Sequence, residues 1–241
     1  MTVVKICGVT SAEDAVQVAG LGADIVGLVL APSRRRVDVH QAAEIVRRVK
    51  HLPRHPAMAG VFVNEPVQAV NDTAAYCDLD MVQLSGNESW DYCRGLEIPF
   101  IKVIHVAQSG DLEKVVQDVA AGYRMVLRRP YICMLDCKTE GGYGGSGRIF
   151  DWDIAEAACA RFPLVVAGGL SPANVRQLIR KAGPCGVDVS SGVESAGRKD
   201  MVKVRDFVRS VRMTGGRTGG RTGEGREILE KILFKGERYA T

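Results

Sequence analysis

PLVVAGGLSPANVRQLIRKAGPCGVDVS, residues 163–190, is the stretch of the chain that best indicates its fold. It begins with a short apolar run at 163–167 and ends with a second one at 186–190. Between them, the apolar residues of 172–182 recur at helical spacing, and the Ser-Pro pair at 171–172 offers an N-cap followed by a proline suited to the first helical position. Short strands buried on both faces and joined by helices are typical of a parallel sheet.

The same alternation continues along most of the chain. Short runs rich in Val, Ile and Leu predict eight strands, at 3–7, 25–30, 58–63, 79–84, 99–104, 131–136, 163–167 and 186–190. Each is followed by a stretch that predicts a helix, at 12–21, 40–50, 66–75, 88–96, 111–121, 152–160, 172–182 and 199–211. One segment, RMVLRRP at 124–130, has two interpretations, an additional strand or an irregular approach to the sixth one.

Eight strand–helix pairs predict an α/β protein with the (β/α)8 TIM-barrel fold. An open doubly wound sheet usually has fewer strands and begins with a glycine-rich dinucleotide turn, whereas the first turn here, CGVTS at 7–11, has no such pattern. Caps for the first helix are available at Thr10 and Ser11.

The composition is typical of a soluble globular protein that buries a full core, with 46% hydrophobic and 25% charged residues. The 32 Lys and Arg residues exceed the 28 Asp and Glu residues by only 4. Such a small surplus does not create the broad positive surface that nucleic-acid binding needs, so we expect no nucleic-acid partner. A small anionic ligand held by a few residues is compatible with it.

Cysteine usage and the N-terminal segment favour a cytoplasmic protein. Seven cysteines are an odd number, no Cys-x-x-Cys pair is present and only four histidines occur, which argues against a disulfide framework and against a zinc site. The first ten residues, MTVVKICGVT, have no signal-peptide run, and no stretch approaches the ~18 consecutive apolar residues of a membrane span. We therefore also expect no membrane contact.

The composition changes after Met213. A Thr-Gly-Gly-Arg repeat without apolar residues predicts a flexible linker over 213–226. The apolar residues of 227–241 fall on one face at helical spacing, which predicts a short amphipathic helical tail. The expected organisation is a catalytic barrel at 1–212 with this linker and tail as a short C-terminal extension.

In a (β/α)8 barrel the active site lies at the carboxyl ends of the strands. Cys7 ends the first predicted strand, where a partly exposed thiol near positive charge can take a proton; the alternative is a small buried hydrophobic residue. Asp136 ends the sixth strand, where an apolar surrounding can raise the pKa of a carboxyl until it serves as a general acid; the alternative is a cap or an ion pair.

Glycine turns follow the last two predicted strands, in AGGLSPANV at 167–175 and VDVSSGVES at 187–195. Barrel enzymes most often hold a phosphate there, on free backbone N–H groups. The loop EGGYGGSGRIFDW at 140–152 has five glycines, which suit close approach to an anion, a lid or simply a solvent-facing loop. The arginines at 34–36 can present a guanidinium to a planar carboxylate, although a run of charges is usually a solvated loop.

Together these segments resemble the phosphoribosylanthranilate isomerase family, the (β/α)8 enzymes of tryptophan biosynthesis. The resemblance covers residues 1 to about 212 and is carried, in the order of the family, by KICGVT at 5–10, GVFVN at 60–64, VQLSG at 82–86, LDCKTEGGYGGSGRIFDW at 135–152, AGGLSPANV at 167–175 and VDVSSGVES at 187–195.

The resemblance implies an isomerase without a cofactor or metal. Its reaction would be the Amadori rearrangement of N-(5-phosphoribosyl)anthranilate to 1-(2-carboxyphenylamino)-1-deoxyribulose 5-phosphate. The expected partner is therefore a small phosphorylated substrate, and the expected protein is a monomer or a homodimer. Asp136 matches the general acid that protonates the ribose ring oxygen, and Cys7 matches the general base that removes the proton from the sugar C2. The implied substrate-binding residues are Gly168, Gly169, Ser191 and Gly192 for the phosphate, Gly144 and Gly145 in the loop that closes above it, and Asp188 beside the sugar.

Two positions depart from the family pattern. Ser85 stands where the family usually has a histidine. In SRRRV at 33–37, the flanking residues align Arg35 with the arginine that binds the anthranilate carboxylate, whereas counting from Cys7 selects Arg36.

Two other functions are compatible with a phosphate-binding barrel. An enzyme of the indole-glycerol-phosphate synthase type needs a catalytic lysine at a strand end, and Lys102 is available, but the further lysine and glutamate set of that family is not evident. A non-catalytic phosphate-binding relative is the second alternative. The presence of both Cys7 and Asp136 argues against it.

Overall fold

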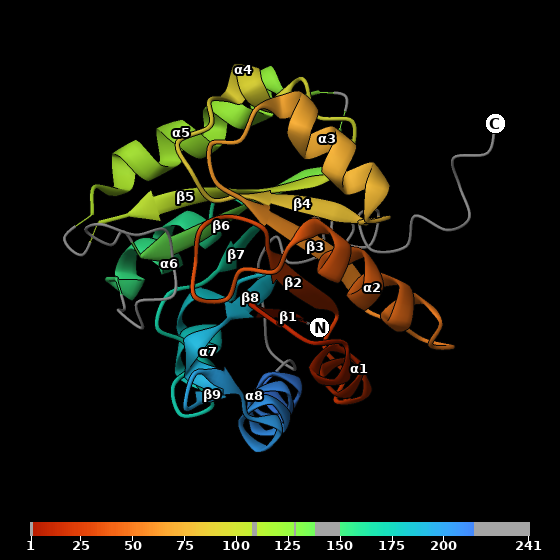
Figure 1. The fold of residues 1–241 in the computed structure, drawn as a ribbon. Coiled ribbons are helices and arrows are strands. Elements are labelled where there is room, and N and C mark those ends of the chain that lie inside the picture. Colours follow the sequence, from red (N-terminus) through yellow and green to blue (C-terminus); the bar gives the residue numbers. More distant parts are fainter. Residues whose placement is uncertain (1, 108–109, 128, 138–149, 215–241) are drawn as a thin grey trace.

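The structure is a computed structural model that describes residues 2–107, 110–127, 129–137 and 150–214, and the strands β1 to β8 form one closed barrel (Figure 1). All neighbours pair in parallel, and the barrel closes because β1 pairs with β8 as well as with β2. The strands are β1 Val3–Cys7, β2 Ile25–Val29, β3 Ala57–Phe62, β4 Met81–Leu84, β5 Phe100–Val106, β6 Tyr131–Cys137, β7 Leu164–Val166 and β8 Gly186–Val189. The predicted (β/α)8 barrel is confirmed, and each strand begins and ends within two residues of its predicted bounds.

Helices surround the barrel and cover its outer face (Figure 1). They are α1 Ala12–Gly20, α2 Val39–Lys50, α3 Val67–Tyr76, α4 Trp90–Cys93, α5 Leu112–Met125, α6 Trp152–Cys159, α7 Val175–Ala182 and α8 Met201–Thr214. Ser11 caps α1, because its hydroxyl accepts a hydrogen bond from Asp14 N at 3.1 Å. A short 3-10 helix, η1 Ser191–Val193, and a small hairpin of β9 Glu194–Ser195 and β10 Arg198–Lys199 lie between β8 and α8, and the sequence patterns did not predict them.

The start of α7 corrects one prediction. Ser171 is not its N-cap and Pro172 is not its first residue, because a turn occupies 171–174. Asn174 stabilises this turn, since its Oδ1 accepts from Ser171 N at 2.8 Å and its Nδ2 donates to Gly169 O at 2.9 Å. The residues assigned to the first helical turn therefore extend the glycine turn after β7.

Two other helices differ from their predicted length. The helix expected at 88–96 is only Trp90–Cys93, because the Asn71 side chain of α3 forms hydrogen bonds with the backbone that follows this helix. The Asn71 amide donates to Gly95 O and accepts from Glu97 N, both at 3.0 Å. In contrast, α5 continues to Met125, and none of the described residues of 124–130 is in a strand, so the interpretation of this segment as an additional strand is wrong.

The last helix fastens the end of the described chain to the amino-terminal end of the barrel. Arg212 of α8 donates to Thr2 O at 2.8 Å and forms an ion pair of 2.8 Å with Asp24. Residues 213 and 214, expected in the linker, are the last two of α8, and the remaining predicted linker and tail lie outside the described residues. Within the described ranges, none of the helices has the length and apolar character needed to cross a membrane.

Strand alternation divides the core into two layers and fixes which side chains enter the barrel. The barrel interior is filled by Ile25, Ala57, Ala59, Met81, Ile101, Val103, Ile132, Met134, Val165 and Ala167. A larger outer layer packs the strands against the helices, and on β1 it contains Val4 and Ile6. Because successive side chains of a strand point to opposite faces, Lys5 and Cys7 face the inside of the barrel.

Candidate active site

The predicted site residues on β6 and β8 also face inward. Leu135 and Cys137 pack in the outer layer, as do Val187 and Val189, so the side chains of Asp136 and Asp188 between them point into the barrel. A small cavity of about 30 Å³ lies at the carboxyl ends of β6, β7 and β8. Its lining includes six predicted site residues, namely Asp136, Gly168, Gly169, Asp188, Ser191 and Gly192.

Asp136 has the electrostatic environment of a carboxylic acid that is partly protonated near neutral pH. Burial and the neighbouring charge of Asp188 raise its pKa from 3.8 to about 7, although the N–H of Cys137 and the ammonium of Lys5 act in the opposite direction. The carboxylate Oδ1 accepts from Cys137 N at 2.8 Å, which fixes its orientation. A carboxyl with this pKa can donate a proton to a substrate oxygen.

Cys7 ends β1 beside Gly27 of β2, with which it is in register. A Cβ at Gly27 would lie 2.8 Å from Cys7 Sγ and 3.1 Å from Lys5 Nζ, so only glycine leaves room for both side chains. The Cys7 thiol is buried, and this burial raises its pKa, whereas the nearby Lys5 ammonium lowers it.

Lys5 is a site residue that the sequence patterns did not identify. Its side chain is almost completely buried inside the barrel, where Nζ lies 2.8 Å from the Asp188 carboxylate. Burial opposes its charge, but Asp188 and Cys7 outweigh this effect and raise the pKa of Lys5. The only available signal was strand alternation, since a lysine two residues before Cys7 must share its face.

The two glycine turns contact each other at the cavity. Gly168 and Gly169 have φ values of +87° and +62°, which favour glycine, and a Cβ at Gly192 would overlap the carbonyl oxygen of Leu170. Within the described residues, the N–H groups of Gly169, Ser191 and Gly192 have no hydrogen-bond acceptor. Free N–H groups on converging turns are suited to an anion such as a phosphate.

The structure separates the roles of the two candidate arginines. Arg35 is buried and its guanidinium binds Glu194 through two hydrogen bonds, with Nε to Oε1 at 2.6 Å and Nη2 to Oε2 at 3.0 Å. Arg36 is exposed, and its guanidinium has no partner among the described residues. Arg36 is therefore the residue of the pair that can meet a ligand without breaking an internal ion pair.

Other expected residues lie elsewhere. Ser85 directly follows β4 and contacts both this strand and its neighbour β5. Gln83 Nε2 of β4 donates to its Oγ at 3.0 Å, and His105 Nε2 of β5 lies 2.9 Å from its carbonyl oxygen. Gly144 and Gly145 lie outside the described residues. In the part of the chain that is described, no group of three or more His, Cys, Asp and Glu side chains is placed to hold a metal ion.

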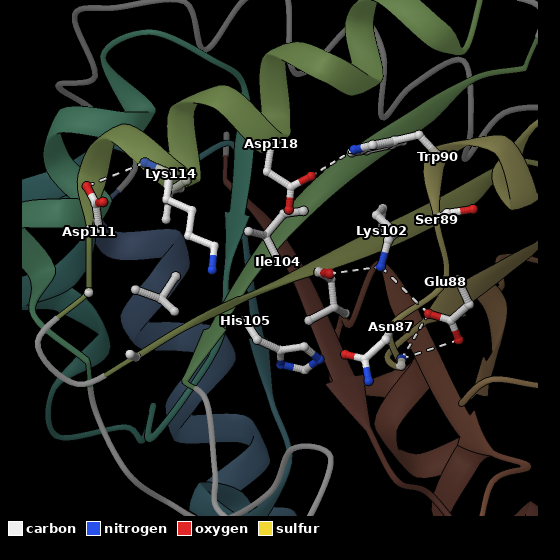
Figure 2. Close-up of a pocket in the computed structure, with 16 residues that line it drawn as sticks. Asn87, Glu88, Ser89, Trp90, Lys102, Ile104, His105, Asp111, Lys114 and Asp118 are labelled. Carbon is white, nitrogen blue, oxygen red and sulfur yellow. Dashed lines mark hydrogen bonds and ion pairs between the residues drawn. The ribbon is translucent and has the colours of Figure 1, made fainter.

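A larger cavity of about 760 Å³ lies between β5 and the helices α4 and α5 (Figure 2), and its lining includes neither Cys7 nor Asp136. Lys102 points into this outer region, with Nζ 3.6 Å from Glu88 and 3.2 Å from Val103 O. The alternative of an indole-glycerol-phosphate synthase type required this lysine at the barrel mouth. Its direction removes the main support for that alternative.

The closed barrel, its inward-facing cysteine and aspartates and its two glycine turns define an enzyme of the (β/α)8 class with a site for a small anionic substrate. The family model described as N-(5'phosphoribosyl)anthranilate (PRA) isomerase matches residues 4–210. The chain belongs to this family, and it is an isomerase of tryptophan biosynthesis.

Individual relatives agree with this assignment. The N-(5'-phosphoribosyl)anthranilate isomerase of Dehalococcoides mccartyi is 44% identical over 208 residues, covering 86% of this chain and 94% of the relative. The crystal structure of the phosphoribosyl anthranilate isomerase of Thermotoga maritima has a TM-score of 0.76 and 38% identity, and the match covers 88% of this chain and 100% of the other. A phosphoribosyl anthranilate isomerase in complex with reduced 1-(o-carboxyphenylamino)-1-deoxyribulose 5-phosphate matches with a TM-score of 0.73 and 35% identity over 88% and 100% of the two chains.

Proposed function

We propose that this chain converts N-(5'-phosphoribosyl)anthranilate to 1-(2-carboxyphenylamino)-1-deoxyribulose 5-phosphate with Asp136 as the general acid and Cys7 as the general base. The observation that carries the proposal is the pKa of Asp136, which is about 7 in a cavity that also contains the two glycine turns. The inward orientation of Cys7 on the opposite part of the same barrel wall supports the second role. An acid and a base on two sides of one sugar are what the rearrangement requires.

The first step opens the ribose ring. Asp136 gives its proton to the ring oxygen, the bond between this oxygen and C1 breaks, and the anilino nitrogen supplies the electron pair that forms an iminium at C1. Asp136 is left as a carboxylate. Proton donation suits this residue because a large share of the carboxyls is protonated near neutral pH.

The second step moves the oxidation level from C1 to C2. The Cys7 thiolate removes the proton from C2, and the electrons of the C–H bond form a C1–C2 double bond that neutralises the iminium. The resulting enolamine takes a proton at C1 and loses the proton of the C2 hydroxyl, which gives the ketose. C1 is reduced and C2 is oxidised within one molecule, so the balance requires no external oxidant or reductant.

Binding groups at the two ends of the substrate have matching chemistry. We assign the phosphate to the free N–H groups of Gly169, Ser191 and Gly192, and the anthranilate carboxylate to the exposed guanidinium of Arg36. Gly168 supports the first turn and Asp188 lies beside the sugar. Closure of the loop containing Gly144 and Gly145 stays a prediction.

The direct test follows the loss of fluorescence of freshly prepared N-(5'-phosphoribosyl)anthranilate after addition of the purified protein, with identification of the product by mass spectrometry and chromatography. We expect conversion to an isomer of unchanged mass. The matched control is the double variant Cys7→Ala/Asp136→Asn, which keeps the barrel and the phosphate turns. Wild-type protein that binds a product analogue but does not exceed this control in turnover would instead favour the non-catalytic phosphate-binding relative.

A further inference from the structure

A buried thiol is a poor base unless a cation stabilises its thiolate. The proposed reaction needs Cys7 in the deprotonated form when it meets the C2 proton. Burial raises the pKa of this thiol, and the negative charge of Asp188 acts in the same direction. The site therefore requires a positive charge close to Cys7 Sγ.

Charged groups approach this thiol from four elements. Lys5 belongs to the same strand, Asp188 comes from β8 and Lys199 from β10, while Asp136 shares the barrel interior from β6. The neighbouring strand β2 contributes Gly27 and no charge at this position. Two cations are thus available to stabilise a Cys7 thiolate.

The ammonium of Lys199 has other partners. It lies 2.8 Å from Glu194 Oε1 and donates to Ser190 O at 3.0 Å, and burial lowers its pKa. The side chain of Arg35 lies beside Gly8, the residue that follows Cys7, and it is also bound to Glu194. Glu194 is the anionic partner of both cations, and also of Arg34. Lys199 still lowers the pKa of the Cys7 thiol, but less than Lys5 does.

Lys5 is placed differently. Its Nζ and the Cys7 Sγ lie on either side of one point, because a Cβ at Gly27 would be 3.1 Å from Nζ and 2.8 Å from Sγ. The Lys5 ammonium lowers the pKa of the Cys7 thiol from this position. The ion pair of 2.8 Å with Asp188 keeps the ammonium inside the barrel and charged. Lys5 therefore has one anionic partner, and a thiolate at Cys7 would be the second.

We propose that Lys5 is a positioning residue for the isomerase reaction: its ammonium donates to Cys7 Sγ and stabilises the thiolate, while Asp188 holds the ammonium in place. The inference rests on the proposed function, because it explains how Cys7 acts as the base. An opposite charge at this range changes the pKa of a group by about 1 to 3 pH units. Replacement of Lys5 by a neutral residue of similar size should raise the pKa of Cys7 by this amount.

The test measures the Cys7 thiolate directly by its ultraviolet absorbance as a function of pH. Each protein is compared with its own Cys7→Ser counterpart, so that the six other cysteines cancel. The variant is Lys5→Met, and the matched control is Lys114→Met, the same replacement at an exposed lysine of α5. Since Lys5→Met leaves the Asp188 carboxylate without its partner, the double variant Lys5→Met/Asp188→Asn removes the pair together and is titrated as well.

We expect the titration midpoint of Cys7 to rise by about 1 to 3 pH units in Lys5→Met and to stay unchanged in Lys114→Met. In the double variant the midpoint should still exceed that of an Asp188→Asn variant that retains Lys5. At neutral pH, kcat of Lys5→Met should fall by about 10-fold or more, with recovery at higher pH and little change in KM. This recovery separates an electrostatic role from a purely structural one.

Two possible results distinguish a failure of the proposed role of Lys5 from a failure of the proposed role of Cys7. A Cys7 midpoint that Lys5→Met and the double variant leave unchanged would overturn the role of Lys5, even if Cys7→Ala abolishes turnover. Normal turnover of Cys7→Ala would overturn the proposed base and with it the mechanistic role of Lys5. A shifted midpoint would then describe only the ionisation of a thiol.

Discussion

Arg35 binds Glu194 through both arms of its guanidinium, with Nε to Oε1 at 2.6 Å and Nη2 to Oε2 at 3.0 Å. This pair joins the turn after β2 to the hairpin after β8. Glu194 also holds Lys199, whose Nζ donates to the carbonyl oxygen of Ser190 next to the phosphate turn. The proposed carboxylate-binding and phosphate-binding ends of the site are thus connected through one buried carboxylate, whose pKa these cations lower despite its burial.

The two arginines should respond differently to truncation. Arg36→Ala removes a free charged donor, so the affinity for a reduced product analogue should fall by about tenfold or more, a loss of ~1.5–3 kcal/mol, while the unfolding midpoint stays unchanged. Arg35→Ala should instead lower the unfolding midpoint, because a buried ion pair loses one partner. Calorimetric titration and denaturation of both variants would check this. A larger loss of affinity in Arg35→Ala, with normal stability, would show that Arg35 binds the anthranilate carboxylate.

The raised pKa of Asp136 predicts a pH-dependent cost to stability. Folding favours the protonated carboxyl, so the folded protein loses stability relative to the unfolded chain as the pH rises from 3.8 to about 7. Asp136→Asn cannot ionise and should be more stable than wild type at pH 8, by on the order of 4 kcal/mol, with a much smaller difference near pH 4. Urea denaturation at the two pH values measures it. The exposed Asp91→Asn is the control, and an equal effect of Asp136→Asn at both pH values would contradict the shifted pKa.

The close contact of the two glycine turns predicts a specific loss of phosphate binding. A Cβ at Gly192 would overlap Leu170 O, so Gly192→Ala must displace one turn from the other. We expect KM for the phosphorylated substrate to rise by about tenfold or more. Gly20→Ala is the control, because its Cβ meets nothing within 4 Å and it lies at the end of α1. Steady-state kinetics with an unchanged KM in Gly192→Ala would place the phosphate elsewhere.

The described barrel should fold without the chain that follows it. Removal of residues 215–241 keeps α8 and the Arg212 contacts with Thr2 and Asp24, so we expect soluble protein with nearly normal turnover. Removal from residue 209 onward deletes Arg212 and should lower the unfolding temperature strongly. Comparison of the two truncated proteins by circular dichroism and fluorescence assay tests this. Insoluble protein after the shorter deletion would show that the tail contributes to the core.

Local patterns predicted the strands well because each strand of a barrel is buried on both faces and follows a helix. The two errors in the helices have different causes. Asn71 of α3 is distant in sequence from the segment after α4 that it binds, so that segment has no signature of the interaction. Asn174 acts locally, because it lies inside the predicted helix and bonds Ser171 and Gly169 in place of a helical turn.

The site could be predicted less completely than the fold. The residues at strand ends, such as Asp136, followed from topology, and their family roles followed from resemblance. Lys5 was missed because its place in the site depends on its ion pair with Asp188. Only the pairing of β1 with β8 brings Lys5 Nζ to 2.8 Å from the Asp188 carboxylate. The choice between Arg35 and Arg36 depended on Glu194, in a hairpin that no sequence pattern predicted.

The proposed reaction depends most directly on Asp136 as the acid and Cys7 as the base. Its test is the kcat of Asp136→Asn and Cys7→Ala, measured by the fluorescence loss of N-(5'-phosphoribosyl)anthranilate, with the affinity for a reduced product analogue measured in parallel. Each variant should lose at least the ~10²–10⁴-fold typical of a missing proton-transfer group, with little change in affinity, and each should leave deuterium at C2 of the substrate. Near-normal turnover of either variant, with the fold verified by circular dichroism, would contradict the account.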